Sequence, residues 1–98
     1  RRPRAARAEA PSVRGALERA RRAAGAGEAE AWAHLAEAVE AQAGTRDREE
    51  VARWAGARAQ PLLRALDQAD ALSFAAALVE RPSPQDVEAA AAALESGG

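Results

Sequence analysis

Residues 66–86 read LDQADALSFAAALVERPSPQD, and this stretch decides the fold. Its apolar residues do not lie on a single helical stripe, because Leu72 and Phe74 fall outside the spacing that the preceding residues set. Ser83 is a favoured N-cap and Pro84 suits the first turn of a helix, so a new helix begins there. We therefore expect the closing corner of a small helical bundle, in which Phe74 packs against a second neighbour.

Two helices should meet at this corner. The earlier one follows Pro61, which disfavours helical geometry at Gln60 but suits a first helical turn. It ends either near Phe74 or at Glu80, and the later one begins at Ser83. Apolar spacing gives the expected buried faces: Leu62, Leu63, Leu66 and Ala69 in the earlier helix, and Val87, Ala90, Ala91 and Leu94 in the later one.

Three further helices are expected before the corner: about residues 12–24, about residues 28–43 and a short one from Asp47. Ser12 is the N-cap of the first, and Gly44 can end the second in the left-handed conformation. Asp47 is followed three residues later by a Glu, which is typical of a capping box. The expected buried positions are Val13, Leu17, Ala20 and Ala24, then Trp32, Leu35, Ala36, Val39 and Ala43, then Val51, Trp54 and Ala55.

These signals predict an all-α fold, a small antiparallel bundle of four to five short helices that spans residues 12–96 as one domain. Ala makes up about a third of the chain, and Ala, Arg, Glu and Leu are strong helix formers. β-Branched residues are scarce, so no sheet is expected. Residues 1–11, RRPRAARAEAP, lack apolar periodicity, and we expect a flexible Arg-rich arm outside the fold.

The composition favours a protein without catalytic chemistry. Cys, Met and Tyr are absent from the sequence, and His34 is its single histidine. His34 follows Trp32 by two residues, so we expect it on the opposite, solvent-exposed side of the helix. We expect the acids Glu37, Glu40, Glu49 and Glu50 to form a solvated face and not a catalytic pair of carboxylates. The sequence therefore predicts no enzyme, no cofactor, no metal site and no small-molecule substrate.

The charge distribution favours a protein partner. All basic residues are Arg, eight of them within residues 1–22, whereas residues 28–50 hold seven acids. Opposite charges on two parts of a surface promote partner choice and encounter rate. Nucleic-acid binding through the Arg arm is the alternative, but it requires a basic surface on the folded part and aromatic stacking positions. A secreted Trp-x-Gly helical hairpin is a further alternative, since Trp54-Ala55-Gly56 has that signature.

The order of these features resembles one known family. An Arg-rich stretch comes first, and a helix with an aromatic-x-x-Leu-x-x-Ala pattern comes next. A helix start in which a Thr precedes two Glu residues follows it. The matching residues are Trp32, Leu35 and Ala38, then Thr45 through Glu50, then Leu63, Asp67, Asp70, Phe74 and Ala75 before a short last helix. This arrangement resembles the C-terminal cytoplasmic helical region of BatD-type proteins, the membrane-anchored members of bacterial aerotolerance operons.

The resemblance implies a non-enzymatic adaptor module on the cytoplasmic side of a membrane. Proteins of this family are associated with MoxR-type ATPases and von Willebrand A-type (VWA) partner proteins, and no catalytic residues carry over. No apolar run here is long enough to span a bilayer. We therefore expect any membrane anchor to lie upstream of Arg1, where the positive-inside rule places arginines at the cytoplasmic end of a span.

Overall fold

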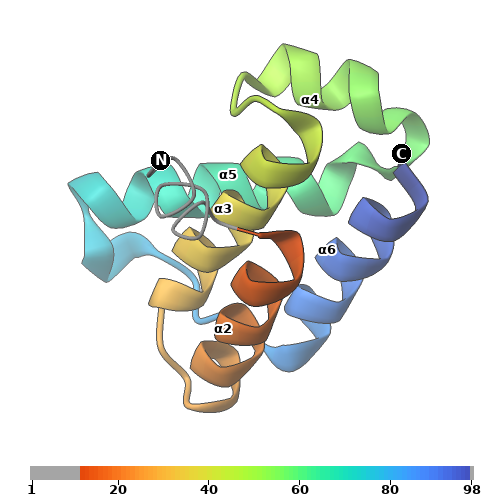
Figure 1. The fold of residues 1–98 in the computed structure, drawn as a ribbon. Coiled ribbons are helices and arrows are strands. Elements are labelled where there is room, and N and C mark those ends of the chain that lie inside the picture. The colour runs from red at the N-terminus through yellow and green to blue at the C-terminus, as the bar shows by residue number, and fades with distance from the viewer. Residues whose placement is uncertain (1–11, 98) are drawn as a thin grey trace, which may run out of the picture.

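The computed structural model describes residues 12–97, and these residues are helical with no strand. The elements are α2 (Val13–Gly25), α3 (Glu30–Ala43), α4 (Arg48–Ala55), η1 (Gly56–Arg58), α5 (Ala59–Phe74), η2 (Ala76–Leu78) and α6 (Pro84–Gly97). Figure 1 shows α2 and α3 side by side, with α5 crossing behind them, α4 above them and α6 beside α2. The predicted all-α bundle of short helices is confirmed. The expected arm, residues 1–11, lies outside the described residues.

α2 and α3 form a hairpin whose turn is set by local signals. The Oγ of Ser12 accepts a hydrogen bond from the Gly15 N–H at 3.0 Å, as expected of an N-cap. Gly27 has φ +73, the left-handed conformation that glycine adopts without strain, and Gly44 ends α3 in the same way at φ +81. The face of α2 that packs into the core is mostly Ala, which lets the two helix axes approach closely.

The break between α4 and α5 lies earlier than the sequence indicates. α4 ends at Gly56, which has φ +61, and the chain passes through η1 before α5 begins at Ala59. Pro61 therefore lies inside the first turn of α5, and no break occurs at Gln60. The Asp47 side chain accepts from the Glu50 N–H at 3.1 Å, but the Asp47 N–H donates to Thr45 Oγ1, so only half of the predicted capping box forms.

The core contains nearly all of the predicted apolar positions. Its largest fully buried side chains are Trp32, Leu35, Leu62, Leu94, Val39, Val51 and Val87. Trp54 is half-buried against this cluster. The longest of the described helices, α5, has 16 residues, so residues 12–97 do not contain the two long helices that a Trp-x-Gly hairpin requires.

One predicted core residue is on the surface. α5 ends at Phe74, the first of the two predicted ends, and the Phe74 side chain is 86% exposed. The expectation that Phe74 packs against a second neighbour is therefore wrong. The physical reason is visible in Figure 1, where the C-terminal end of α5 projects on the side away from α6. The last helix therefore leaves the final turn of α5 uncovered.

Candidate functional site

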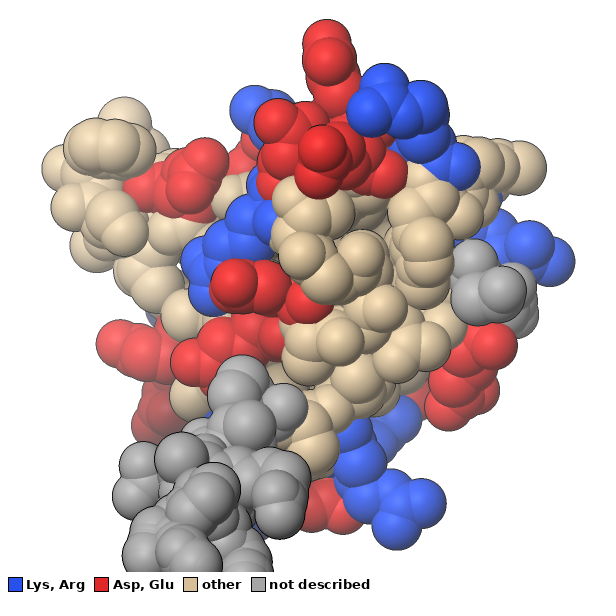
Figure 2. All heavy atoms as spheres, turned by 45° about the horizontal axis from the view of Figure 1, so that its top comes forward, with Lys and Arg blue, Asp and Glu red and all other residues tan. Residues whose placement is uncertain are grey.

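The most prominent surface feature is an apolar corner, formed by Phe74, Ala76, Ala77 and Leu78 at the end of α5 and in η2. All four residues are exposed, and the two large ones, Phe74 and Leu78, are the exposed large hydrophobic residues of the described chain, at 86% and 80%. In Figure 2 the end of α5 forms a lobe at the left that carries mostly uncharged atoms. An apolar projection of this kind is typical of a contact surface for another molecule.

The backbone turns sharply at the apolar corner. Ala75 leaves helical geometry with φ −151 and ψ 75, and its N–H still donates to the Ala71 carbonyl at 2.7 Å. η2 follows, closed by a hydrogen bond from the Leu78 N–H to the Ala75 carbonyl at 2.8 Å. Val79 is extended and packs against the core. The corner is therefore a short, hydrogen-bonded turn between α5 and the returning chain.

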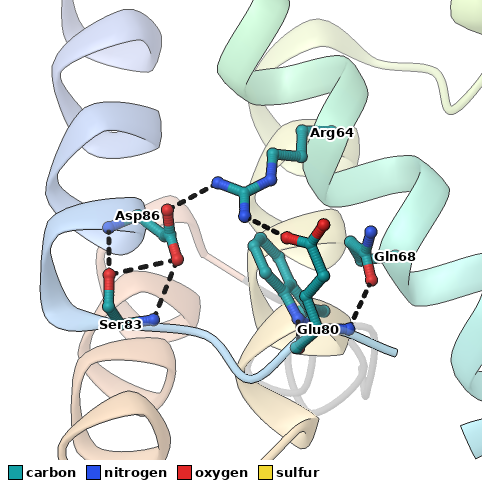
Figure 3. Close-up of polar contacts among 6 residues, drawn as sticks. Arg64, Gln68, Glu80, Ser83 and Asp86 are labelled. Atoms are coloured by element: carbon teal, nitrogen blue, oxygen red, sulfur yellow. Dashed lines mark hydrogen bonds and ion pairs between the residues drawn. The ribbon is translucent and has the colours of Figure 1, made fainter. Parts of the chain in front are cut away.

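Three side chains hold the chain just after the corner, and we call this arrangement the Glu80 clamp (Figure 3). The Glu80 N–H donates to Gln68 Oε1 at 3.0 Å, and the Glu80 carbonyl accepts from Trp32 Nε1 at 2.7 Å. The Glu80 carboxylate pairs with the Arg64 guanidinium. Backbone N–H, backbone carbonyl and side chain of one residue are therefore all fixed by α3 and α5.

Arg64 connects the Glu80 clamp to the start of α6. Its Nη1 donates to Asp86 Oδ1 at 2.6 Å, and its guanidinium lies 5.0 Å from the centre of the Trp32 ring. The hydrogen bonds to Glu80 and then to Asp86 raise the pKa of Arg64. One guanidinium thus joins α5, the returning chain and α6, and contacts the face of the buried indole.

The predicted N-cap of α6 is confirmed, and it takes part in the same network. The Ser83 N–H donates to Asp86 Oδ2 at 2.9 Å, and the Asp86 N–H donates to Ser83 Oγ at 3.3 Å, which is a reciprocal capping box. Burial raises the pKa of Asp86, but the hydrogen bonds from the Ser83 N–H and from Arg64 outweigh it, so the pKa lies below its usual range. Asp86 is therefore held as a carboxylate.

An open hollow of about 620 Å³ runs along the outer side of α5, next to the Glu80 clamp. Leu63 and the small residues Gly56 and Ala57 line its apolar part, and Asp67 and Glu80 contribute carboxylates. Asp67 also pairs with Arg48 of α4. The hollow thus lies along α5, and the apolar corner lies at the C-terminal end of the same helix.

Of the residues considered for catalysis, His34 and Glu37 lie close together, and the other acids lie on the exposed surface. His34, predicted to be exposed, is half-buried, and its Nδ1 has no hydrogen-bond partner and lies 3.6 Å from Glu37 Oε1. That expectation was wrong because α2 packs beside this side of α3, where Arg19 reaches Glu37 at 3.3 Å. Glu40 pairs with Arg46 at 2.7 Å, and Glu49 and Glu50 are exposed. Among the described residues no group of three His, Cys, Asp or Glu side chains could hold a metal ion.

Comparison of the chain with protein-family models, with curated proteins and with solved structures finds no match. None of the helices among residues 12–97 is long and apolar enough to cross a membrane. The apolar corner and the Glu80 clamp are the candidate functional features of the described residues.

Sequence reasoning did not identify either feature. The sequence signal for the apolar corner is that Phe74 lies off the buried stripe of its helix, but the same spacing also fits a second packing face. The Glu80 clamp joins residues far apart in the sequence, since Trp32 and Glu80 are separated by 48 positions. No local pattern reports such a contact.

Proposed function

We propose that this chain is a non-enzymatic protein-interaction module that binds its partner through the apolar corner. The observation that carries this proposal is the exposure of Phe74 at 86% and Leu78 at 80% on one short turn. Burial of such a side chain is worth about 1.5–3 kcal/mol, so the pair offers a substantial driving force for association. The Glu80 clamp supports the same function, because a turn held in place loses little conformational entropy on binding.

The resemblance to BatD-type proteins suggests the setting. In this proposal the chain is the cytoplasmic tail domain of a bacterial membrane-anchored BatD-like protein, tethered through a segment upstream of Arg1. It acts as an adaptor for MoxR-type ATPases and VWA-type proteins. Support comes from the order of the helix-level features, and two residues that carry the resemblance, Asp70 and Phe74, lie on the exposed side of α5.

A titration of purified proteins tests the proposal. The wild-type chain is titrated, by isothermal calorimetry, with the MoxR-type ATPase and the VWA-type proteins of the same cell. The double variant Phe74→Glu/Leu78→Glu should lose binding by at least about tenfold, because it places charge in an apolar contact. The control Ala89→Glu/Ala92→Glu adds the same two charges to exposed positions of α6 and should bind like the wild type.

Three results separate the parts of the proposal. Binding that the Phe74→Glu/Leu78→Glu variant retains would show that the apolar corner is not the contact surface. Absence of binding to both protein classes would contradict the adaptor role with these partners. A gel shift with DNA or RNA that depends on Arg1, Arg2, Arg4 and Arg7, and that falls steeply with salt, would favour the nucleic-acid alternative.

A further inference from the structure

We infer that the partner segment received by this surface is a basic amphipathic helix, an inference that rests on the proposed function and adds the chemistry of the partner. The surface consists of the outer side of α5, the hollow beside it and the apolar corner. Its shape, its spacing of apolar residues and its charge each favour this occupant.

The outer side of α5 presents a helical stripe. Leu63, Asp67, Asp70 and Phe74 follow one another at the i, i+4, i+7, i+11 spacing, so they lie on one face. This face lies beside the core-facing side of α5, which carries the buried Leu62 and Leu66. The stripe is about 16 Å long at 1.5 Å per residue, which corresponds to about three turns of a second helix lying along it.

The stripe borders a depression and not a flat surface. The hollow of about 620 Å³ has Leu63 and Ala59 among its lining, and Gly56 and Ala57 place no large side chain in the space. Phe74 stands exposed at the end of α5, and Leu78 stands exposed in η2 just after it. Apolar residues on one face of a partner helix can therefore contact Leu63 in the hollow and Phe74 at the corner, which is the helix-in-groove mode of recognition.

The surface is acidic. Its charged side chains are Arg64, Asp67, Asp70 and Glu80, which gives a formal charge of −2. Two of these side chains pair with residues outside the surface, Asp67 with Arg48 and Arg64 with Asp86. These two partners add one positive and one negative charge, so the formal charge of −2 is unchanged. Among the ion pairs of the described residues none includes Asp70. Arg81 does not offset this charge, since its guanidinium lies near Gly27.

This combination selects a cationic occupant with aliphatic stems. The methylene chains of Lys or Arg can cover Leu63 and Phe74 while their charged ends reach Asp67 and Asp70. A second copy of the chain would place acid against acid, and an anionic membrane would be repelled in the same way. A partner strand finds no sheet edge among residues 12–97, because these contain no strand. A basic helix satisfies all three conditions.

Fluorescence anisotropy with a synthetic probe tests the inference. The probe is a labelled Leu/Lys amphipathic peptide helix, and the matched control probe has Glu in place of Lys. We expect the Leu/Lys peptide to bind, with an affinity that falls as salt is raised, and the Leu/Glu peptide not to bind. Phe74→Ala should weaken binding by about tenfold, and Asp70→Asn by about threefold. Glu49→Gln removes an exposed acid of α4 and should leave binding unchanged.

Several results would overturn the inference. These are equal binding of both peptides, a Phe74→Ala variant that binds like the wild type, and a loss in Glu49→Gln as large as in Asp70→Asn. Phosphatidylglycerol vesicles that bind through Phe74 would point to a lipid surface, and a dimer in sedimentation that Phe74→Ala dissociates would point to a second copy.

If neither peptide binds while Phe74→Glu/Leu78→Glu still abolishes partner binding, the helix assignment fails and the proposed function stands. If the Leu/Lys peptide binds but the Phe74→Glu/Leu78→Glu variant still binds its protein partner, the proposed function fails instead.

Discussion

At the scale of single residues, Trp32 links the core to the surface turn. Its ring is 1% exposed, its Nε1 donates to the Glu80 carbonyl at 2.7 Å, and the Arg64 guanidinium covers its face. An aromatic side chain that fills the core and also holds a returning segment couples core packing to the position of the surface turn. Loss of this indole should therefore lower the stability of the fold and also loosen the position of the apolar corner.

Trp32→Ala should lower the free energy of unfolding by about 3–5 kcal/mol, because it removes a buried aromatic side chain and leaves a cavity. Trp54 is half-buried, so Trp54→Ala should cost less, about 1–2 kcal/mol. Urea unfolding followed by circular dichroism measures both values. Equal losses in the two variants would show that the difference in burial does not control the stability.

Asp86 should make the stability depend on pH. Its pKa is lower in the folded chain than in the unfolded one, so its contribution to stability is present above the unfolded pKa, about 4. This contribution is lost as the pH falls through the folded pKa. The Arg21 hydrogen bond also lowers the pKa of Glu88, which acts in the same direction. In urea titrations between neutral and acidic pH, Asp86→Asn and Glu88→Gln should each flatten the pH dependence, and a curve that neither flattens would contradict this assignment.

At the scale of elements, the starts of α2, α4 and α6 could be predicted from the sequence, whereas the break between α4 and α5 and the exposure of the end of α5 could not. Ser12, Asp47 and Ser83 cap helices as expected, because a cap depends on residues within one turn. Whether Phe74 is buried depends on which part of α5 the last helix covers. Packing between elements distant in the sequence decides this. The candidate surface was missed for this reason.

Arg64→Ala should release the returning segment without melting the helices. The variant loses the pairs to Glu80 and Asp86 and the contact with the Trp32 ring. Since Arg64 is 40% exposed, solvent weakens these pairs, and we expect a loss of about 1–2 kcal/mol. Hydrogen exchange should accelerate at residues 78–83 and at the first turn of α6. Arg46→Ala, which removes an exposed pair with Glu40, should leave this region protected; if it does not, the Glu80 clamp is not what orders the segment.

At the scale of the whole molecule, the core is built largely from Ala with few large side chains. The radius of gyration is 13.3 Å, close to the value of about 13 Å typical of a compact domain of this length. Small residues at helix contacts permit short distances between axes, so the fold gains dispersion contacts where it lacks bulky side chains. A core of this kind should tolerate added volume poorly.

Ala20→Leu tests this dependence on small side chains. Ala20 lies on the buried face of α2 with no exposed area, so a Leu there must push α2 away from its neighbours or adopt a strained rotamer. We expect a loss of about 1–3 kcal/mol, measured as a shift in the urea midpoint. Ala41 lies on the exposed side of α3, and Ala41→Leu should change stability little. A neutral or stabilising effect of Ala20→Leu would mean that the helices are packed loosely enough to accept a larger side chain. The close approach of α2 to the rest of the bundle would then not be what limits its stability.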